Sequence, residues 1–151
     1  MDHRNAPPLN PLPPVIWLLA LPMIAMEIVV SAGAAGLVGG AQGVGWRLQA
    51  LERFVYAPDV MRPMWEAGQY PAAQMMRFVT YPFVHGNFTH TLFVVVILLA
   101  LGKMVGEAFR WWAVLVIFFG ATLAGAAVYT ALPMVHMPLY GGYPPVYGLI
   151  G

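Results

Sequence analysis

The chain has 151 residues, of which 60% are hydrophobic and only 9% are charged. Soluble domains carry about 25% charged residues, so this composition predicts a membrane protein, and the length predicts a single domain. The formal net charge of +1 argues against nucleic-acid binding because no basic patch exists to neutralise phosphates, and the absence of cysteine excludes disulfides, thiolate metal ligands and a cysteine nucleophile.

The amino-terminal part of the chain predicts a leader followed by a membrane anchor. Residues 1–13 are proline-rich, so we expect an extended segment rather than a helix, either a stiff leader or a docking peptide. Residues 14–38 are apolar for long enough to cross a hydrocarbon core of about 30 Å. A secretory signal peptide has a shorter apolar region, so we interpret 14–38 as a membrane span.

Glu27 lies near the middle of this first span. A carboxylate inside a membrane is a candidate functional group because burying an unpartnered charge is costly. It would serve either as a proton relay or as a partner for a cationic group on another chain. The alternative is a neutral side chain, or one placed near the membrane interface by a shift of the helix.

Residues 39–87 interleave charged and apolar side chains and predict a long loop at the membrane interface. Leu48, Leu51 and Val55 recur at helical spacing, and the charged residues around them lie largely on other faces. This pattern is typical of short amphipathic helices that lie on a membrane, with tryptophans at headgroup depth. The alternative is an ordinary surface loop.

Three further apolar segments cover residues 88–105, 111–132 and 139–151. The first two are long enough to be spans. The third ends after about ten residues, whereas a span needs about 20, so we expect the natural product to be longer. Basic residues near the span ends favour a cytoplasmic amino terminus.

The 111–132 segment contains two pairs of small residues four positions apart, Gly120 with Ala124 and Ala121 with Gly125. This spacing lets membrane helices approach closely. We expect it to serve packing within the chain, with dimerisation as the alternative.

Two histidines, His85 and His90, stand at the entry to the second span. Five positions along a helix rotate a side chain by about 140°, so we expect the two rings to point to different faces. They are therefore poor ligands for one metal ion, and the zinc-binding HExxH pattern is absent. We predict no metal or cofactor site. The histidines serve either as hydrogen-bonding ties or as part of a reactive site.

The string around these histidines resembles the entry to the second span of the rhomboid family of intramembrane serine proteases. The matching positions are Arg77, Thr80, Phe83, His85 and His90. By this resemblance the second histidine donates a hydrogen bond to the oxyanion. An asparagine four residues later would be the second donor.

Four more positions extend the resemblance. Gly102 matches the glycine that ends the family's second span, and Glu107 lies one residue beyond its glutamate. A charge paired with nearby basic residues is the alternative interpretation of Glu107. Gly141 and Gly148 fit the glycine frame around the nucleophile at the start of the fourth span.

The chain departs from the family at the positions that carry the chemistry. Tyr143 stands in place of the nucleophilic serine, Pro144 follows it, and Val94 replaces the asparagine, although His90 is retained. Losing one oxyanion donor costs about 10²–10³ in rate. A tyrosine also reaches much further than serine and would fill the cavity meant for substrate. Ser31 is the only serine, and we interpret it as a helix-packing residue.

The resemblance implies an all-α membrane protein with a rhomboid-like bundle of six helices, of which three spans and the start of a fourth are present. We expect a catalytically degenerate member in a bacterial inner membrane. It would bind transmembrane helices of client or partner proteins, in assembly, in quality control or as an accessory subunit. The alternatives are an active intramembrane serine endopeptidase and a purely structural subunit of a larger membrane complex.

Overall fold

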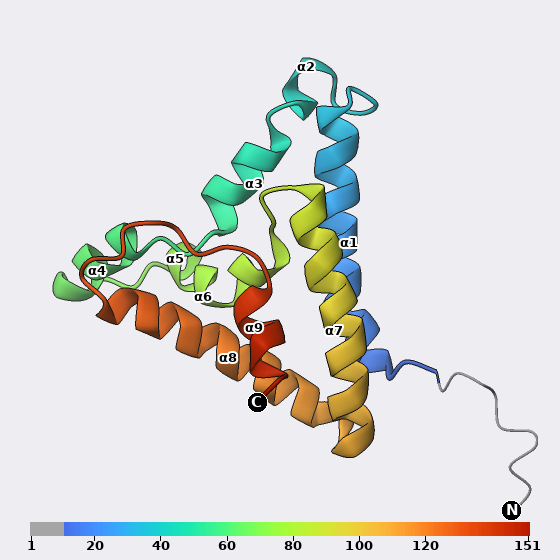
Figure 1. Cartoon of the computed structure of the whole chain (residues 1–151). Coiled ribbons are helices and arrows are strands. Elements are labelled where there is room, and N and C mark those ends of the chain that lie inside the picture. The colour runs from blue at the N-terminus through green and yellow to red at the C-terminus, as the bar shows by residue number, and fades with distance from the viewer. Residues whose placement is uncertain (1–10) are drawn as a thin grey trace, which may run out of the picture.

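The computed structural model describes residues 11–151, and within that range it is all-helical apart from one isolated bridge between Tyr56 and Leu139 (Figure 1). Three helices are long and apolar enough to cross a membrane: α1 (Pro14–Ala34), α7 (Phe88–Ala108) and α8 (Trp111–Ala131). The predicted all-α membrane fold is therefore confirmed. The leader expected over 1–13 falls mostly outside the described residues.

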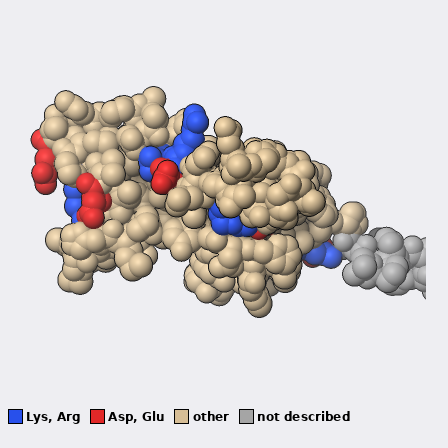
Figure 2. Space-filling model, turned by 90° about the horizontal axis from the view of Figure 1, so that it is seen from above, with Lys and Arg blue, Asp and Glu red and all other residues tan. Residues whose placement is uncertain are grey.

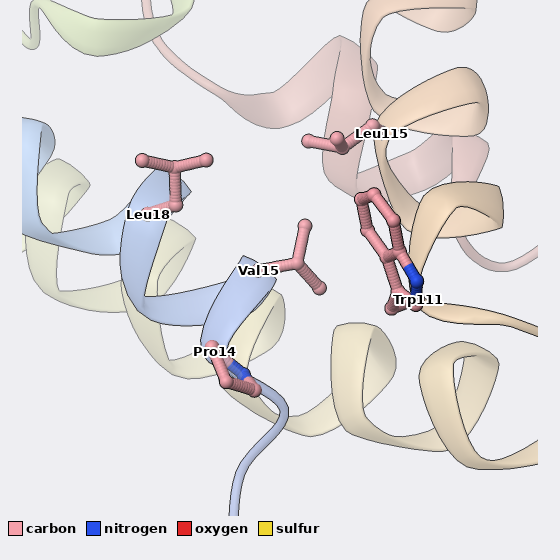
Figure 3. A pocket seen from close by; sticks show the side chains of 5 residues that line it. All are labelled: Pro14, Val15, Leu18, Trp111 and Leu115. Carbon is pink, nitrogen blue, oxygen red and sulfur yellow. The ribbon is translucent and has the colours of Figure 1, made fainter.

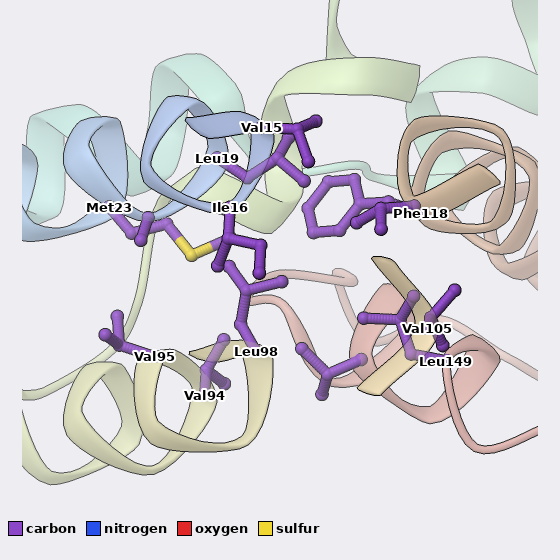
Figure 4. Close-up of a cluster of buried hydrophobic side chains, with 13 residues drawn as sticks. Val15, Ile16, Leu19, Met23, Val94, Val95, Leu98, Val105, Phe118 and Leu149 are labelled. Carbon is purple, nitrogen blue, oxygen red and sulfur yellow. The ribbon is translucent and has the colours of Figure 1, made fainter. Parts of the chain in front are cut away.

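The apolar core lies where the three long helices meet. α1 and α7 run side by side, and α8 crosses away from them after the short turn that joins it to α7 (Figure 1). Ile16 and Met23 of α1, Leu98 of α7 and Phe118 of α8 are fully buried together (Figure 4). Full burial of such a side chain stabilises a fold by about 1.5–3 kcal/mol in water. In a membrane, close packing takes over that role.

Short helices connect α1 to α7. They are α2 (Gly40–Gly43), α3 (Trp46–Phe54), α4 (Pro58–Glu66), α5 (Ala72–Met75), α6 (Arg77–Thr80) and the 3-10 turn η2 (Tyr81–Phe83). α3 contains Leu48 and Leu51 of the predicted amphipathic pattern, whereas Val55 is the extended residue that follows the helix. α7 then begins with a helix cap, because the Asn87 side chain accepts a hydrogen bond from the His90 backbone N–H at 2.9 Å.

Arg62 of α4 holds the carboxyl-terminal end of α8. Its guanidinium donates hydrogen bonds to the carbonyls of Tyr129 at 3.0 Å, Thr130 at 3.1 Å and Val135 at 2.9 Å. The last carbonyls of a helix have no partner within the helix, so this side chain supplies one. The contact holds α4 against the carboxyl-terminal end of α8, and the two lie side by side in Figure 1.

Charged side chains are sparse on the outside of the molecule. Seen from above, they form small isolated groups on a broad surface of uncharged residues (Figure 2). A mostly apolar exterior of this kind suits helices surrounded by lipid.

The short helix α9 (Tyr143–Gly148) packs against α8 through small residues. A Cβ added at Gly148 would lie 2.4 Å from the Cβ of Ala121, and one at Gly125 would lie 3.2 Å from Pro144. One small-residue face of α8 therefore serves packing within the chain, as expected. Gly120, on the other small pair, has nothing within 4 Å of an added Cβ.

Replacing Gly148 with alanine is expected to lower the free energy of unfolding by about 1–3 kcal/mol, because the new methyl overlaps Ala121. Gly120→Ala is the matched control. That site is open, so the alanine is expected to be neutral or to stabilise the helix by up to about 1 kcal/mol. Denaturant titration in detergent micelles measures both. Equal effects of the two substitutions would contradict the packing described here.

Candidate functional site

The segment before α7 and the turn before α9 meet beside the first turn of α7. Tyr81, fully buried in η2, donates its hydroxyl to the Thr122 carbonyl of α8 at 2.9 Å and accepts the Gly141 N–H at 2.9 Å through its own carbonyl. These bonds place Gly141–Tyr143 next to His85 and His90. The histidine-containing string and the glycine-rich string of the sequence therefore form one site.

The two histidine rings contact each other, with centroids 4.9 Å apart and planes at 84°. The expectation that they point to different faces is wrong. α7 begins only at Phe88, so His85 lies in the irregular segment before the helix and its ring is free to turn towards His90. Within residues 11–151 no group of three or more potential ligands could hold a metal ion.

His85 acts as a hydrogen-bond acceptor. It is 3% exposed, and its Nε2 accepts the Gly142 backbone N–H at 3.2 Å. Burial, and to a smaller extent the neighbouring His90, lower the pKa of His85 from 6.5 to about 4. The ring is therefore neutral near pH 7, as the acceptor role requires.

This lowered pKa makes stability depend on pH. Between pH 6.5 and 4 the unfolded chain binds a proton at position 85 that the folded chain does not. The free energy of unfolding is therefore expected to fall as the pH falls, by about 2–3 kcal/mol from pH 7 to pH 4.5. Denaturant titrations of His85→Gln at both pH values should show a free energy of unfolding that falls less steeply with pH than that of the wild type. A pH dependence as steep as that of the wild type would refute the assignment.

Tyr143 covers His90. The two rings stack with centroids 4.7 Å apart and planes at 18°, and Tyr147 stacks on the other side of Tyr143 at 5.6 Å. The His90 Nε2 atom is buried and has no hydrogen-bond partner among the described residues. The Tyr143 ring thus covers a face of the His90 imidazole.

Val94 packs against the turn before α9. The residue is fully buried, and a Cβ added at Gly142 would lie 2.5 Å from its Cγ1. A methyl group therefore packs directly against the backbone of the turn before α9. The side chain at position 94 carries no hydrogen-bond donor.

A second polar cluster adjoins the histidines and centres on Glu27. Its carboxylate accepts two hydrogen bonds from Arg47, at 2.6 and 2.9 Å, one from Ser31 at 2.6 Å and one from Thr91 at 2.7 Å. Arg47 also donates to the His85 carbonyl at 3.1 Å. The cation facing Glu27 comes from the same chain. Ser31, which the sequence predicts as a helix-packing residue, therefore also belongs to this polar cluster.

Glycines allow Arg47 to reach back into the first span. A Cβ at Gly33 would lie 2.5 Å from the Gly43 carbonyl oxygen, and one at Gly43 would lie 3.0 Å from the Gly33 Cα. The backbones of α1 and α2 are thus in direct contact, which turns the start of α3 towards Glu27. The amphipathic pattern of residues 39–87 places Arg47 on the polar face of an interfacial helix and does not predict this contact. The sequence does contain a signal for the pair: an acid, Glu27, lies inside an apolar span, and few basic residues are present to neutralise it.

The remaining motif residues lie outside the histidine site. Arg77 donates to the Val55 carbonyl at 3.0 Å and Thr80 to the Phe54 carbonyl at 3.3 Å, so both hold the end of α3. Gly102 lets α7 approach α1 closely, since its Cβ would lie 3.3 Å from Ile16. Glu107 is half-exposed and pairs with Lys103 at 3.8 Å.

An apolar cavity of about 530 Å³ lies apart from both polar clusters. Figure 3 shows it between the first turns of α1 and α8, with Val15 and Leu18 on one side and Trp111 and Leu115 on the other. Its lining offers almost no hydrogen-bonding groups, so it suits an apolar occupant.

These features define a polytopic helical membrane protein with a histidine-containing site between its second span and a glycine-framed short helix. The family model of the Rhomboid domain matches residues 72–151, more than half of the chain and all of the histidine site. The chain belongs to the rhomboid family. Comparison with curated proteins and with solved structures found no significant match.

Proposed function

We propose that this rhomboid-family membrane protein is proteolytically inactive and binds transmembrane helices of client or partner proteins. The observation that carries the proposal is the stacking of Tyr143 on His90, at 4.7 Å, where the family resemblance places the nucleophile. A serine nucleophile needs a small hydroxyl aimed at the substrate and activated by a base. Here an aromatic ring fills that space and Val94 removes a donor.

Two features support helix binding. The outer faces of the three spans are apolar, and the cavity between Val15 and Trp111 offers a place for an apolar side chain of another helix (Figure 3). Membrane helices associate through packing of this kind. We place the protein in a bacterial inner membrane with a cytoplasmic amino terminus, acting in assembly or quality control or as an accessory subunit.

Labelling with a serine-directed fluorophosphonate tests the loss of proteolysis. The 151-residue chain in membranes is expected to remain unlabelled, because Ser31 is the only serine among these residues and its hydroxyl is bonded to Glu27. Ser31→Ala is the control for reaction at that residue. Labelling of the wild type that Ser31→Ala abolishes would revive the endopeptidase alternative.

Photocrosslinking tests helix binding. A photoreactive amino acid at Leu18, which lines the cavity, is expected to crosslink to transmembrane segments of other proteins. The same group at the exposed Glu66, on α4, is the control. Crosslinks to one protein in fixed stoichiometry would indicate a permanent structural subunit, and a range of partners would indicate transient client binding. Crosslinks to lipid alone would contradict the proposal.

A further inference from the structure

Two apolar cavities adjoin beneath α3. The first, of about 260 Å³, lies between α1 and α3, and the second, of about 220 Å³, lies between α1, the end of α3 and residues 80–84. Both are lined by Met26 and Phe54. The two cavities are therefore neighbours on either side of these shared residues, and together we name them the α3 groove, with Trp46 in the wall of the first and Phe83 in the wall of the second.

The mouth of the α3 groove carries an uncompensated positive charge. Arg53 lines the first cavity and is exposed, and its guanidinium carbon lies 5.9 Å from the centroid of the Phe54 ring. Among the described residues, the arginine ion pairs are Arg47 with Glu27 and Arg62 with Asp59. Glu52 is adjacent in sequence, yet it makes no ion pair with Arg53. The groove thus combines a cationic mouth with an apolar interior.

The depth of the groove matches the boundary of a bilayer. Val30 lies in the last turns of α1, which ends at Ala34, and Met26 lies one turn deeper, so the groove extends from the middle of that span towards its carboxyl-terminal end. Trp46 forms part of the wall, and tryptophan favours headgroup depth. Figure 1 shows α3 beside this end of α1.

We propose that the α3 groove binds one phospholipid of the surrounding bilayer, with its phosphate on Arg53 and an acyl chain along Met26, Phe54 and Phe83. Guanidinium groups pair with phosphate through parallel hydrogen bonds. The apolar walls match an acyl chain, and the single cation matches a single phosphate. This site is independent of the histidine cluster and of the loss of proteolysis.

Native mass spectrometry of the whole chain tests the proposal. Protein is taken from nanodiscs of phosphatidylethanolamine and phosphatidylglycerol into mild detergent, and the retained phospholipid is counted. Wild-type protein is expected to retain one lipid of either headgroup, because the phosphate is common to both. Arg53→Gln is expected to weaken retention about tenfold, which corresponds to about 1.4 kcal/mol. Ala50→Trp, which fills the groove, is expected to abolish it.

Matched controls separate the groove from the rest of the surface. Arg110→Gln removes another exposed arginine, and Ala124→Trp adds bulk to an exposed face of α8. Both are expected to retain the lipid as wild type does. Equal loss in Arg53→Gln and Arg110→Gln, or no retained lipid in the wild type, would overturn the proposal.

A photoreactive phospholipid gives a second readout that does not depend on variant stability. A diazirine on the acyl chain is expected to label peptides that contain Met26 or Phe83 in wild-type protein. Labelling spread evenly over all three spans would overturn the proposal. A polypeptide bound at this position in place of lipid, detected by native mass spectrometry, would also overturn the proposal.

Discussion

Replacing Arg47 with leucine is expected to lower the free energy of unfolding by about 3–5 kcal/mol, the cost of leaving a buried charge without its partner. Arg47 makes two hydrogen bonds to the Glu27 carboxylate, which is itself 6% exposed in the middle of α1. It also holds the His85 carbonyl. The substitution therefore exposes Glu27 to an apolar environment and frees the segment before α7. Denaturant titration in detergent micelles measures the change.

The double variant Glu27→Leu with Arg47→Leu is the informative control. Replacing a buried ion pair by apolar side chains is often neutral or stabilising, so the double variant is expected to recover most of the stability lost in the single one. Arg110→Leu, at an exposed position, should change stability by at most about 0.5 kcal/mol. If the double variant were as unstable as the single one, the ion pair would not explain the effect.

The spans were the most predictable part of the fold. A run of about 20 apolar residues has few alternatives in a membrane, because every backbone group must be bonded within the segment. Hydropathy alone therefore places α1, α7 and α8. The end of α1 is less certain from hydropathy, since residues 35–38 are apolar too, yet the helix ends at Ala34, shortly before Gly36 with its positive φ of 72°.

The polar contacts were not predictable in the same way. Glu27 and Arg47 are twenty positions apart, and their pairing depends on the direct backbone contact between Gly33 and Gly43. The spacing of His85 and His90 predicts different faces only if both residues lie on one helix, and α7 begins after His85. Arg62 meets the end of α8 across about seventy residues. Such contacts follow from the path of irregular segments, which periodicity does not encode.

Gly141 combines two features that require glycine, a positive φ and a close approach of the His90 ring. A larger residue at this position is therefore expected to destabilise the histidine site. The Gly141 φ of +82° costs a residue with a Cβ about 1–2 kcal/mol. An added Cβ would also lie 2.5 Å from both Cε1 and Nε2 of His90. Overpacking of this kind costs about 1–3 kcal/mol more. Gly141→Ala is therefore expected to lose about 2–5 kcal/mol in a denaturant titration.

Gly36→Ala separates the two contributions. Gly36 has a similar φ of +72°, but nothing lies within 4 Å of an added Cβ, so only the backbone cost of about 1–2 kcal/mol is expected. The difference between the two variants measures how firmly His90 is held between Gly141 and Tyr143. A rigid stack gives a large difference, because the imidazole has nowhere to move. If both variants lose the same free energy of unfolding, the His90 ring moves away from the added methyl group at little cost. In that case Tyr143 does not hold the His90 ring in one position.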